Sequence, residues 1–287
     1  MIRTSLVNAA GVFTSLSMAF AFFVTPTGAL AAEKPLSFYV LSQRTPALTS
    51  QEWNPILTYV GKKSGVPLEL KLAKTSHDGN AIAEKGLYDF QYTNHFFTPE
   101  RDKLGYKVII RRAGTGIKSE IVVPAGSPVQ TLADLSGKDV AFVSKDGFTG
   151  YWLPLDALLK AKVDVNVVIT GNQEASSAQL RINKVAAAGV NSTIMARYGR
   201  REGFEYRVLW TSEVYHDLCI MANPKVPAEK VTAVRNAFVG MVKDPEGKKI
   251  LEDAAELLKQ KGELGFVAAE NRDYDNYRAF YKQTLVK

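Results

Sequence analysis

Cysteine is almost absent from this sequence of 287 residues, since Cys219 is the only one. A single thiol cannot form an intramolecular disulfide, so the fold has to be stabilised by packing. Reactive and metal-binding thiolates usually have an electropositive neighbour or a second thiol, whereas Cys219 lies between Leu218 and Ile220. This setting indicates a small, buried, apolar residue.

Catalytic and metal-binding motifs are also missing. The sequence contains no G-x-S-x-G elbow, no G-x-x-x-x-G-K-[ST] phosphate loop and no H-E-x-x-H zinc motif. The three histidines, His77, His95 and His216, have no clustered carboxylates beside them. We therefore expect no metal, no other cofactor and no catalysis.

Long runs of basic residues are missing too, although the formal net charge is +7. Lys and Arg occur as pairs scattered among Asp and Glu, and never as a run of five. This pattern predicts a mild attraction for small anions and argues against a nucleic-acid interface.

The apolar stretch from about Ala9 to Val24 is followed by the small-residue pattern Ala29-Leu30-Ala31 and preceded by Arg3. These are the parts of a secretory signal peptide, so we expect residues 1–31 to be cleaved off. An uncleaved anchor is the alternative, but the stretch is short and interrupted for a spanning helix. No Cys lies near the cut, so a free, monomeric periplasmic protein is expected rather than a lipoprotein.

Strand-like and helix-like patterns alternate along the chain from residue 36. The first series of expected strands is 36–41, 67–73, 89–93 and 106–111, with helices at 51–63, 78–85 and 96–103. The helix at 51–63 would be capped by Thr49 or Ser50 and stopped by Gly65, with an apolar face formed by Trp53, Ile56, Leu57 and Val60. A strongly β-prone run follows at 117–123. After the breakers Pro124, Gly126 and Pro128, a second series is expected, with strands 139–143, 166–170, 185–190 and 206–210 and helices 150–161, 174–184 and 192–200. A strand at 218–222 and helices at 228–242, 245–260 and 274–285 complete the chain.

This order predicts an α/β protein with two lobes, each a mainly parallel sheet flanked by helices. The first lobe is expected to be discontinuous, at 32–115 and 218–287, and the second to be 124–210. Two hinge crossings, 116–123 and 211–217, would join them. Because ligands of open α/β sheets bind beyond the carboxyl ends of the strands, the lobes would face each other across a cleft that closes on its ligand.

Hydroxyls, amides and glycines follow several of the expected strands. Together with the unpaired N–H groups of helix starts, such residues could bind a tetrahedral oxyanion. Helix capping explains any one of these loops equally well, so the interpretation depends on several of them converging. The residues expected to line the cleft are Thr45, Tyr92, Thr93, Asn94, His95, Phe148, Thr149, Gly150, Tyr151, Asn191, Tyr215 and His216. An imidazolium at His95 or His216 would tighten anion binding below about pH 6.5.

Several short motifs follow one another in a recognisable order. They are Trp53-Asn54-Pro55-Ile56-Leu57, Tyr88-Asp89-Phe90-Gln91-Tyr92-Thr93-Asn94, Ser119-Glu120-Ile121-Val122-Val123, Leu132-Ala133-Asp134-Leu135-Ser136-Gly137-Lys138, Asp146-Gly147-Phe148-Thr149-Gly150-Tyr151 and Val208-Leu209-Trp210. In these motifs the chain resembles the phosphate/phosphite/phosphonate substrate-binding proteins of ABC transporters, which have the type II periplasmic-binding-protein fold. The resemblance implies a ligand clamp of Tyr92, Thr149 with its flanking backbone, and the residue at the position of Asn191.

The sequence departs from the pattern of that family in three places. Phe148 stands beside Thr149 in place of a second hydroxyl, in a loop that is shorter, and His95 adds an imidazole. Asn191 occupies a position that is acidic in members with amino-phosphonate ligands. These departures favour a simple oxyanion, such as phosphate, phosphite or a metalloid analogue. The expected partner is an ABC transporter permease, and a membrane sensor kinase is the alternative.

Overall fold

The computed structural model describes residues 1–2, 5, 34–41, 43–260 and 262–287. The chain divides into two units, Met1–Glu33 and Lys34–Lys287. The expected signal peptide therefore lies almost entirely outside the described residues. Within the part of the chain that is described, no helix has both the length and the apolar character needed to cross a membrane.

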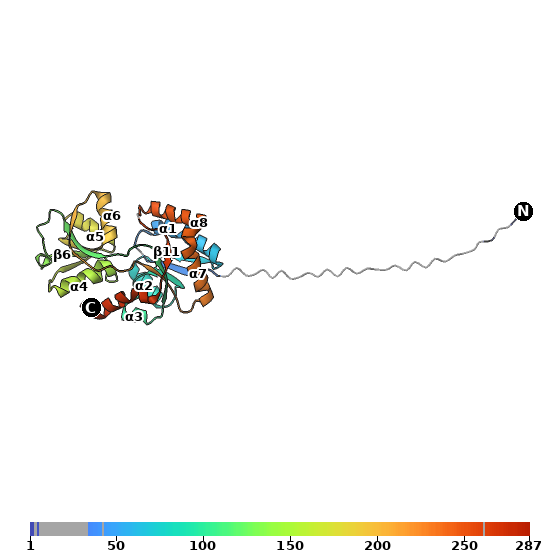
Figure 1. Ribbon diagram of the computed structural model, residues 1–287, viewed down its shortest axis with the longest axis horizontal. Helices are drawn as coiled ribbons and strands as arrows, with labels where there is room; N and C mark the ends of the chain where they lie inside the picture. The colour runs from blue at the N-terminus through green and yellow to red at the C-terminus, as the bar shows by residue number, and fades with distance from the viewer. Residues whose placement is uncertain (3–4, 6–33, 42, 261) are drawn as a thin grey trace. The chain divides into compact units, whose positions relative to one another are not determined.

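The first lobe, in which Figure 1 labels β11, is built on a sheet with the strand order β11-β4-β10-β3-β1-β2. Its strands are β1 Leu36–Val40, β2 Leu68–Lys71, β3 Phe90–Thr93, β4 Lys107–Arg112, β10 Cys219–Ala222 and β11 Phe266–Ala268. The helices of this part are α1 Pro46–Ser64, α2 Ser76–Glu84, α3 Pro99–Asp102, α7 Ala228–Gly240, η3 Met241–Lys243, α8 Pro245–Leu257, η4 Asn271–Tyr274 and α9 Asp275–Gln283. β1 pairs in parallel with β2 and β3, and β10 is antiparallel to both β3 and β4.

The second lobe is built on a sheet with the strand order β7-β6-β8-β5-β9. Its strands are β5 Ser119–Pro124, β6 Asp139–Phe142, β7 Asn166–Ile169, β8 Ala187–Asn191 and β9 Tyr206–Thr211. Its helices are η1 Ala133–Leu135, η2 Phe148–Trp152, α4 Leu153–Lys160, α5 Gln173–Arg181 and α6 Ser192–Glu202. β6 pairs in parallel with β7 and β8, whereas β5 is antiparallel to β8 and β9.

The two sheets confirm the predicted two-lobed α/β fold, and both sheets are mixed. In the first sheet β1, β2, β3 and β4 run in one direction and only β10 and β11 are reversed; in the second, β5 alone is reversed. The prediction missed β11. This strand is three residues long, too short to show the alternation on which sequence-based assignment depends.

The helix α1 begins five residues before its predicted start. The hydroxyl of Thr45 accepts a hydrogen bond from the Leu48 N–H (3.4 Å), and Pro46 occupies the first helical position. These are two strong start signals, and they replace the caps predicted at Thr49 or Ser50. The helix ends where predicted, at Gly65 with φ 70°. The predicted apolar face is confirmed, because its residues are buried in the first lobe: Trp53, Ile56, Leu57 and Val60.

The helix predicted at 96–103 is only four residues long. Thr98 caps it by accepting from the Arg101 N–H at 3.4 Å, and Pro99 starts it. Phe96 and Phe97, which the prediction placed on the helix, are instead buried in the preceding turn.

β5 begins inside the first expected crossing, 116–123. It pairs with β8 and β9, so its residues belong to the second sheet rather than to a free connection. The residues before β5 pair with the second expected crossing, 211–217, because Ile117 and Tyr215 exchange backbone hydrogen bonds of 2.7 and 2.9 Å. The two connections between the lobes therefore run side by side.

The C-terminal tail makes a further connection between the lobes. Asp156 of α4 accepts hydrogen bonds from the Thr284 hydroxyl (2.9 Å) and the Leu285 N–H (2.8 Å). Val286 is buried in the core of the second lobe. The last residues of the chain, which the sequence analysis assigns to the first lobe, therefore pack on the second lobe.

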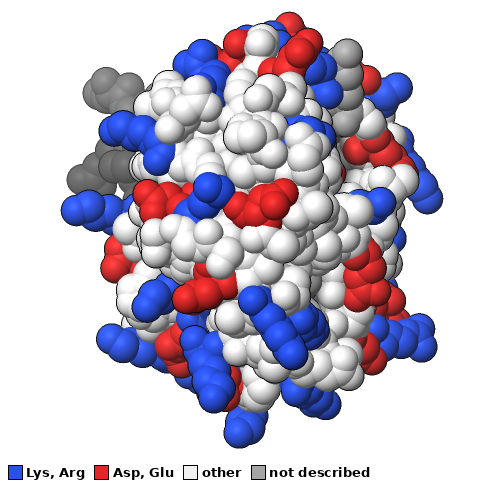
Figure 2. All heavy atoms as spheres, turned by 90° about the vertical axis from the view of Figure 1, so that its left-hand side faces the viewer, with Lys and Arg blue, Asp and Glu red and all other residues white. Residues whose placement is uncertain are grey.

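Charged side chains are mixed on the face of the molecule shown in Figure 2. Lys and Arg are interspersed with Asp and Glu over most of this face, and basic side chains predominate along its lower edge. The view agrees with the scattered basic pairs in the sequence.

Candidate functional site

A small cavity of about 60 Å³ lies where the strand-end turns of the two lobes meet. We call it the cleft cavity. Its described lining comes from the turns after β1, β3, β6, β7 and β8, the start of α2 and the two connections between the lobes: Leu41, Gln43, Ser76, Asn94, His95, Ile117, Val143, Ser144, Gly147, Phe148, Thr149, Gly171, Asn172, Gln173, Asn191 and Asp217. The carboxyl ends of strands from both sheets thus surround one space.

Five of the predicted residues line this cavity. Asn94 and His95 follow β3 of the first lobe, and Phe148, Thr149 and Asn191 come from the second lobe. The structure therefore brings together residues that are almost a hundred positions apart in the sequence.

Three predicted residues of the first lobe do not belong to the described lining of the cleft cavity. Thr45 is exposed and caps α1. The hydroxyl of Tyr92 accepts a hydrogen bond from Arg112 Nε at 3.2 Å, and its ring packs on Trp53 with 4.7 Å between centroids. Thr93 is fully buried, and its hydroxyl accepts from the His95 N–H at 3.1 Å, which shapes the turn that presents His95.

Gly150 and Tyr151 support the cavity from behind. A Cβ at Gly150 would lie 2.5 Å from Val143 Cγ2, so only glycine allows this turn to pack so closely. Tyr151 is buried in the core of the second lobe, edge-on to Phe142.

Tyr215 and His216 lie in the second connection between the lobes. The ring of Tyr215 packs edge-on against Phe148, with 4.8 Å between centroids. The carbonyl of His216 accepts a 2.6 Å hydrogen bond from the Tyr277 hydroxyl. Neither residue belongs to the described lining of the cleft cavity.

The sequence analysis missed several polar residues that line the cavity, namely Gln43, Ser76, Ser144, Asn172, Gln173 and Asp217. The rule that selected Asn191 also applies to Asn172 and Gln173, since both follow a strand and open a helix. Asp217 carried no such signal, because it precedes a strand.

Three side-chain amides line the cavity, those of Asn172, Gln173 and Asn191. The oxygen atom of each accepts a backbone hydrogen bond, which leaves its NH₂ group as a donor. Asn191 Oδ1 accepts from the N–H groups of Thr193 and Ile194 at 3.0 and 3.1 Å, which caps α6. Asn172 Oδ1 caps α5 by accepting from the Ala175 N–H at 2.9 Å.

Gln173 Oε1 accepts from the Asn191 N–H at 3.0 Å. Among the described residues, the NH₂ groups of all three amides donate to no partner. The Thr149 hydroxyl is likewise unbonded there, while the Thr149 carbonyl is held by the Ser119 hydroxyl at 2.7 Å. These side chains and the helix starts beside them form a donor surface suited to an anion.

One acidic group, Asp217, also lines the cavity. Burial raises the pKa of its carboxyl, while the Leu218 N–H and the guanidinium groups of Arg112, Arg44 and Arg197 act in the opposite direction. The Leu218 N–H donates to Asp217 Oδ1 at 2.7 Å. In its ionised form Asp217 offers a hydrogen-bond acceptor to the cavity.

His95 is held in its neutral form. Burial lowers the pKa of its imidazole to about 4, and Asn80 Nδ2 lies 3.1 Å from its Nδ1. The expectation that an imidazolium at His95 tightens anion binding below pH 6.5 is therefore wrong. In the part of the chain that is described, no group of His, Cys, Asp and Glu is placed to hold a metal ion.

Acidification should destabilise the protein through His95. In the unfolded chain its imidazole titrates near pH 6.5, whereas the folded pKa is about 4. The stability contributed by neutral His95 is complete above pH 6.5 and is lost as the pH falls through the folded pKa.

Urea unfolding should show the wild type losing about 1.5 kcal/mol more than the His95→Gln variant between pH 6.5 and pH 5. Equal losses in the two proteins would contradict the burial of a neutral imidazole.

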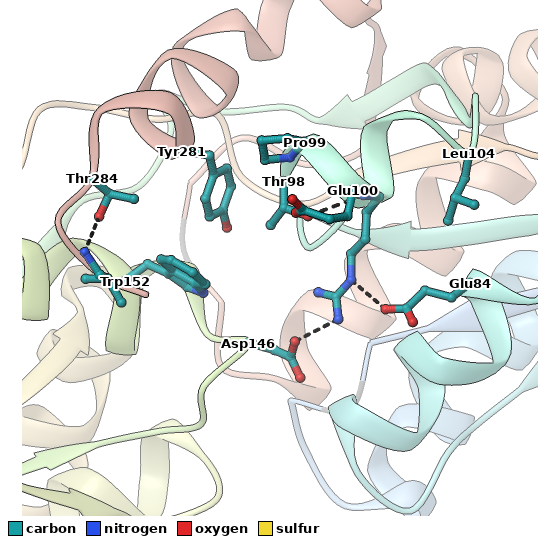
Figure 3. A pocket seen from close by; sticks show the side chains of 11 residues that line it. Glu84, Thr98, Pro99, Glu100, Leu104, Asp146, Trp152, Tyr281 and Thr284 are labelled. Carbon is teal, nitrogen blue, oxygen red and sulfur yellow. Dashed lines mark hydrogen bonds and ion pairs between the residues drawn. The ribbon is translucent and has the colours of Figure 1, made fainter.

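An ion pair joins the two lobes beside the cleft cavity. Arg101 of α3 contacts Asp146 of the second lobe (Nη2 to Oδ1, 2.9 Å) and Glu84 of α2 (Nε to Oε1, 2.7 Å). Figure 3 shows both interactions in a separate pocket, with the two carboxylates on either side of the guanidinium. Arg101 also donates to the His95 carbonyl at 3.2 Å, so this pair depends on the turn that lines the cleft cavity.

Comparisons with known proteins agree with this geometry. A family model described as "ABC transporter, phosphonate, periplasmic substrate-binding protein" matches residues 38–274. No curated protein sequence matches the chain.

Two solved structures share the fold. PhnD1 from Prochlorococcus marinus, in complex with methylphosphonate, is 15% identical with a TM-score of 0.73, and the match covers 87% of this chain and 98% of that one. A binding-protein component of an ABC phosphonate transporter from Pseudomonas aeruginosa is 16% identical with a TM-score of 0.72, covering 86% of each chain.

A third structure is a Xanthomonas citri protein bound to a chloride ion. It is 15% identical with a TM-score of 0.69, and the match covers 86% of this chain and 97% of that one. The fold is thus the type II periplasmic-binding-protein fold. Because the family model covers most of the chain, this protein belongs to the periplasmic phosphonate substrate-binding proteins of ABC transporters.

Proposed function

We propose that this protein captures a small phosphonate, phosphite or phosphate ion in the cleft cavity and delivers it to its transporter. The observation that carries the proposal is the surplus of hydrogen-bond donors there. Three amide NH₂ groups and the Thr149 hydroxyl line a cavity of about 60 Å³ without a partner among the described residues. A buried donor gains most from an acceptor that is charged.

Ligand binding should favour the closed arrangement of the lobes. The donors on Thr149, Asn172, Gln173 and Asn191 belong to the second lobe, whereas Asn94 and Ser76 belong to the first. A ligand that contacts both sets binds best when the lobes meet, so it shifts the population toward closure. The Arg101–Asp146 pair adds an attraction between the lobes in the same arrangement.

Asp217 would select the protonation state of the ligand. A carboxylate repels an anion at contact distance, but it accepts a hydrogen bond from a P–OH group. Phosphate, phosphite and alkylphosphonates keep a proton in one of their forms near neutral pH, whereas sulfate does not. The methylphosphonate bound by the Prochlorococcus relative is of the first kind. We therefore propose that sulfate is rejected.

We also propose the bounds of the lobes, the processing of the N-terminus and the partner, from the sequence and from the contacts described above. The lobes are 32–115 with 218–283, and 119–210 with the C-terminal tail, joined through residues near 116–118 and 211–217. Residues 1–31 would be a cleaved signal peptide. No Cys lies near the cut, so the mature protein would be free rather than a lipoprotein, and we propose that it is a monomer. A sensor kinase is not proposed as the partner, because the matching family serves ABC transporters.

Calorimetric titration tests the proposed function. The wild type should bind methylphosphonate, phosphite or phosphate and should not bind sulfate. Thr149→Ala should weaken binding of the preferred ligand by about 1–3 kcal/mol, since the anion loses a charge-assisted hydrogen bond.

The matched control for this titration is Thr232→Ala. Thr232 is an exposed residue of α7 whose hydroxyl bonds within its own helix, so the affinity should be unchanged. Binding of sulfate in place of the phosphorus oxyanions would refute the proposal.

A further inference from the structure

A second, larger cavity adjoins the cleft cavity on one side. It has a volume of about 970 Å³ and shares Gln43, Ser76, Gly171, Asn172 and Gln173 with the cleft cavity. We call it the vestibule. Because the two cavities have these five residues in common, they lie next to each other.

The vestibule is strongly basic. Six cationic side chains line it, against the single carboxylate of Glu174 within its described lining: Arg44, Lys74, Arg197, Arg200, Arg201 and Lys259. They come from both lobes, since Arg44, Lys74 and Lys259 belong to the first and the arginines of α6 to the second. A wall with such an excess of cationic side chains attracts anions.

Arg197 is the central member of this set. Its Nη1 donates to the Leu258 carbonyl of the other lobe at 3.4 Å, and among the described residues it forms no ion pair. Burial, the neighbouring Arg44, and the other arginines of α6 lower its pKa. Its charge is therefore incompletely compensated by the protein.

Two other arginines of the vestibule differ in this respect. Arg201 is paired with Glu174 and Glu202, and Arg44 is paired with the buried Glu52. The vestibule also has an apolar wall, formed by Leu48, Ile194, Leu257 and Leu258. An alkyl chain could lie on this wall between the two cavities.

We propose that the vestibule is a second-anion subsite, and that the ligand is an organic phosphonate or phosphate whose alkyl substituent ends in a carboxylate or a second phosphate. The phosphorus oxyanion occupies the cleft cavity, and the terminal anion binds Arg197. This inference rests on the proposed function, and it extends that function from a small ion to a substituted one.

Matched pairs of probes test the inference. Each ω-phosphonocarboxylate with three to six carbons is compared with the alkylphosphonate of the same chain length, and methylphosphonate reports on the cleft cavity alone. In the wild type, the best carboxylate should bind about tenfold more tightly than its alkyl partner, as expected for one additional charge-assisted contact.

Arg197→Gln should abolish this advantage and leave the affinity for methylphosphonate within about twofold of the wild type. Arg272→Gln is the charge-matched control, because Arg272 is exposed on η4 and pairs with Glu270 outside the vestibule; it should retain the advantage.

Three results would overturn the inference. The carboxylates and their alkyl partners could bind equally to the wild type, or the advantage could survive in Arg197→Gln. Finally, Arg197→Gln could weaken the binding of all probes equally and slow their association. The vestibule would then only steer anions toward the cleft cavity. If methylphosphonate and every other probe fail to bind, the proposed function fails as well, which distinguishes the two failures.

Discussion

Replacing Asn191 by Asp is expected to abolish binding of a phosphorus oxyanion and to leave the fold intact. Asp caps a helix as well as Asn does, so the bonds from the Thr193 and Ile194 N–H groups to the side chain are retained. What changes is the face toward the cavity, where a carboxylate replaces an NH₂ donor. Two like charges about 4 Å apart repel by about 4 kcal/mol at the effective dielectric constant of a protein.

Calorimetry should therefore show affinity falling by about a thousandfold in Asn191→Asp. Its melting temperature without ligand should stay close to that of the wild type. The control is Asn271→Asp on η4, where the side-chain oxygen likewise accepts a backbone N–H, that of Val108 at 2.8 Å, outside the cavity. Retained affinity in Asn191→Asp would show that the anion does not bind beside α6.

Truncating Phe148 is expected to give the largest loss of stability among the residues around the cavity. Its ring is 1% exposed and stacks on Tyr277 with 4.1 Å between centroids. Tyr215, Phe280 and Tyr281 surround the rest of the ring. Since Phe148 comes from the second lobe and Tyr277 from α9, this aromatic cluster joins the lobes next to Thr149.

Phe148→Ala should lower the free energy of unfolding by about 3–5 kcal/mol, because it leaves a cavity in a packed cluster. Phe148→Leu keeps most of the apolar volume and should cost much less. Urea unfolding measures both. A loss below about 1 kcal/mol in Phe148→Ala would contradict the packing described here.

The order of strands and helices could be predicted from the sequence because each element is marked by its own periodicity and ends. Gly65 stopped α1 where expected, and the strand at β6 was identified within one residue. The start of α1 was predicted wrongly because Thr45 and Pro46 were assigned to a loop. The exact extent of the crossings could not be predicted, since pairing of β5 with β8 and β9 is a tertiary property.

The site was predictable only in part. Position after a strand selected Asn94, Thr149 and Asn191, which line one cavity in the structure. It could not show which side of the backbone a side chain occupies. The hydroxyl of Tyr92 therefore accepts a hydrogen bond from Arg112, and the residue does not belong to the described lining of the cavity. Arg197 was missed because a helical arginine carries no local signal; only the approach of α6 to α8 gives it a role.

The crystal structure of the protein soaked with methylphosphonate tests the central claim most directly. The phosphonate oxygens should lie about 2.7–3.1 Å from the Thr149 hydroxyl and from the amide nitrogen of Asn191 or Gln173. At least one further contact should come from the first lobe, near Ser76 or Asn94. A phosphonate bound by one lobe only, or away from these strand ends, would contradict the account.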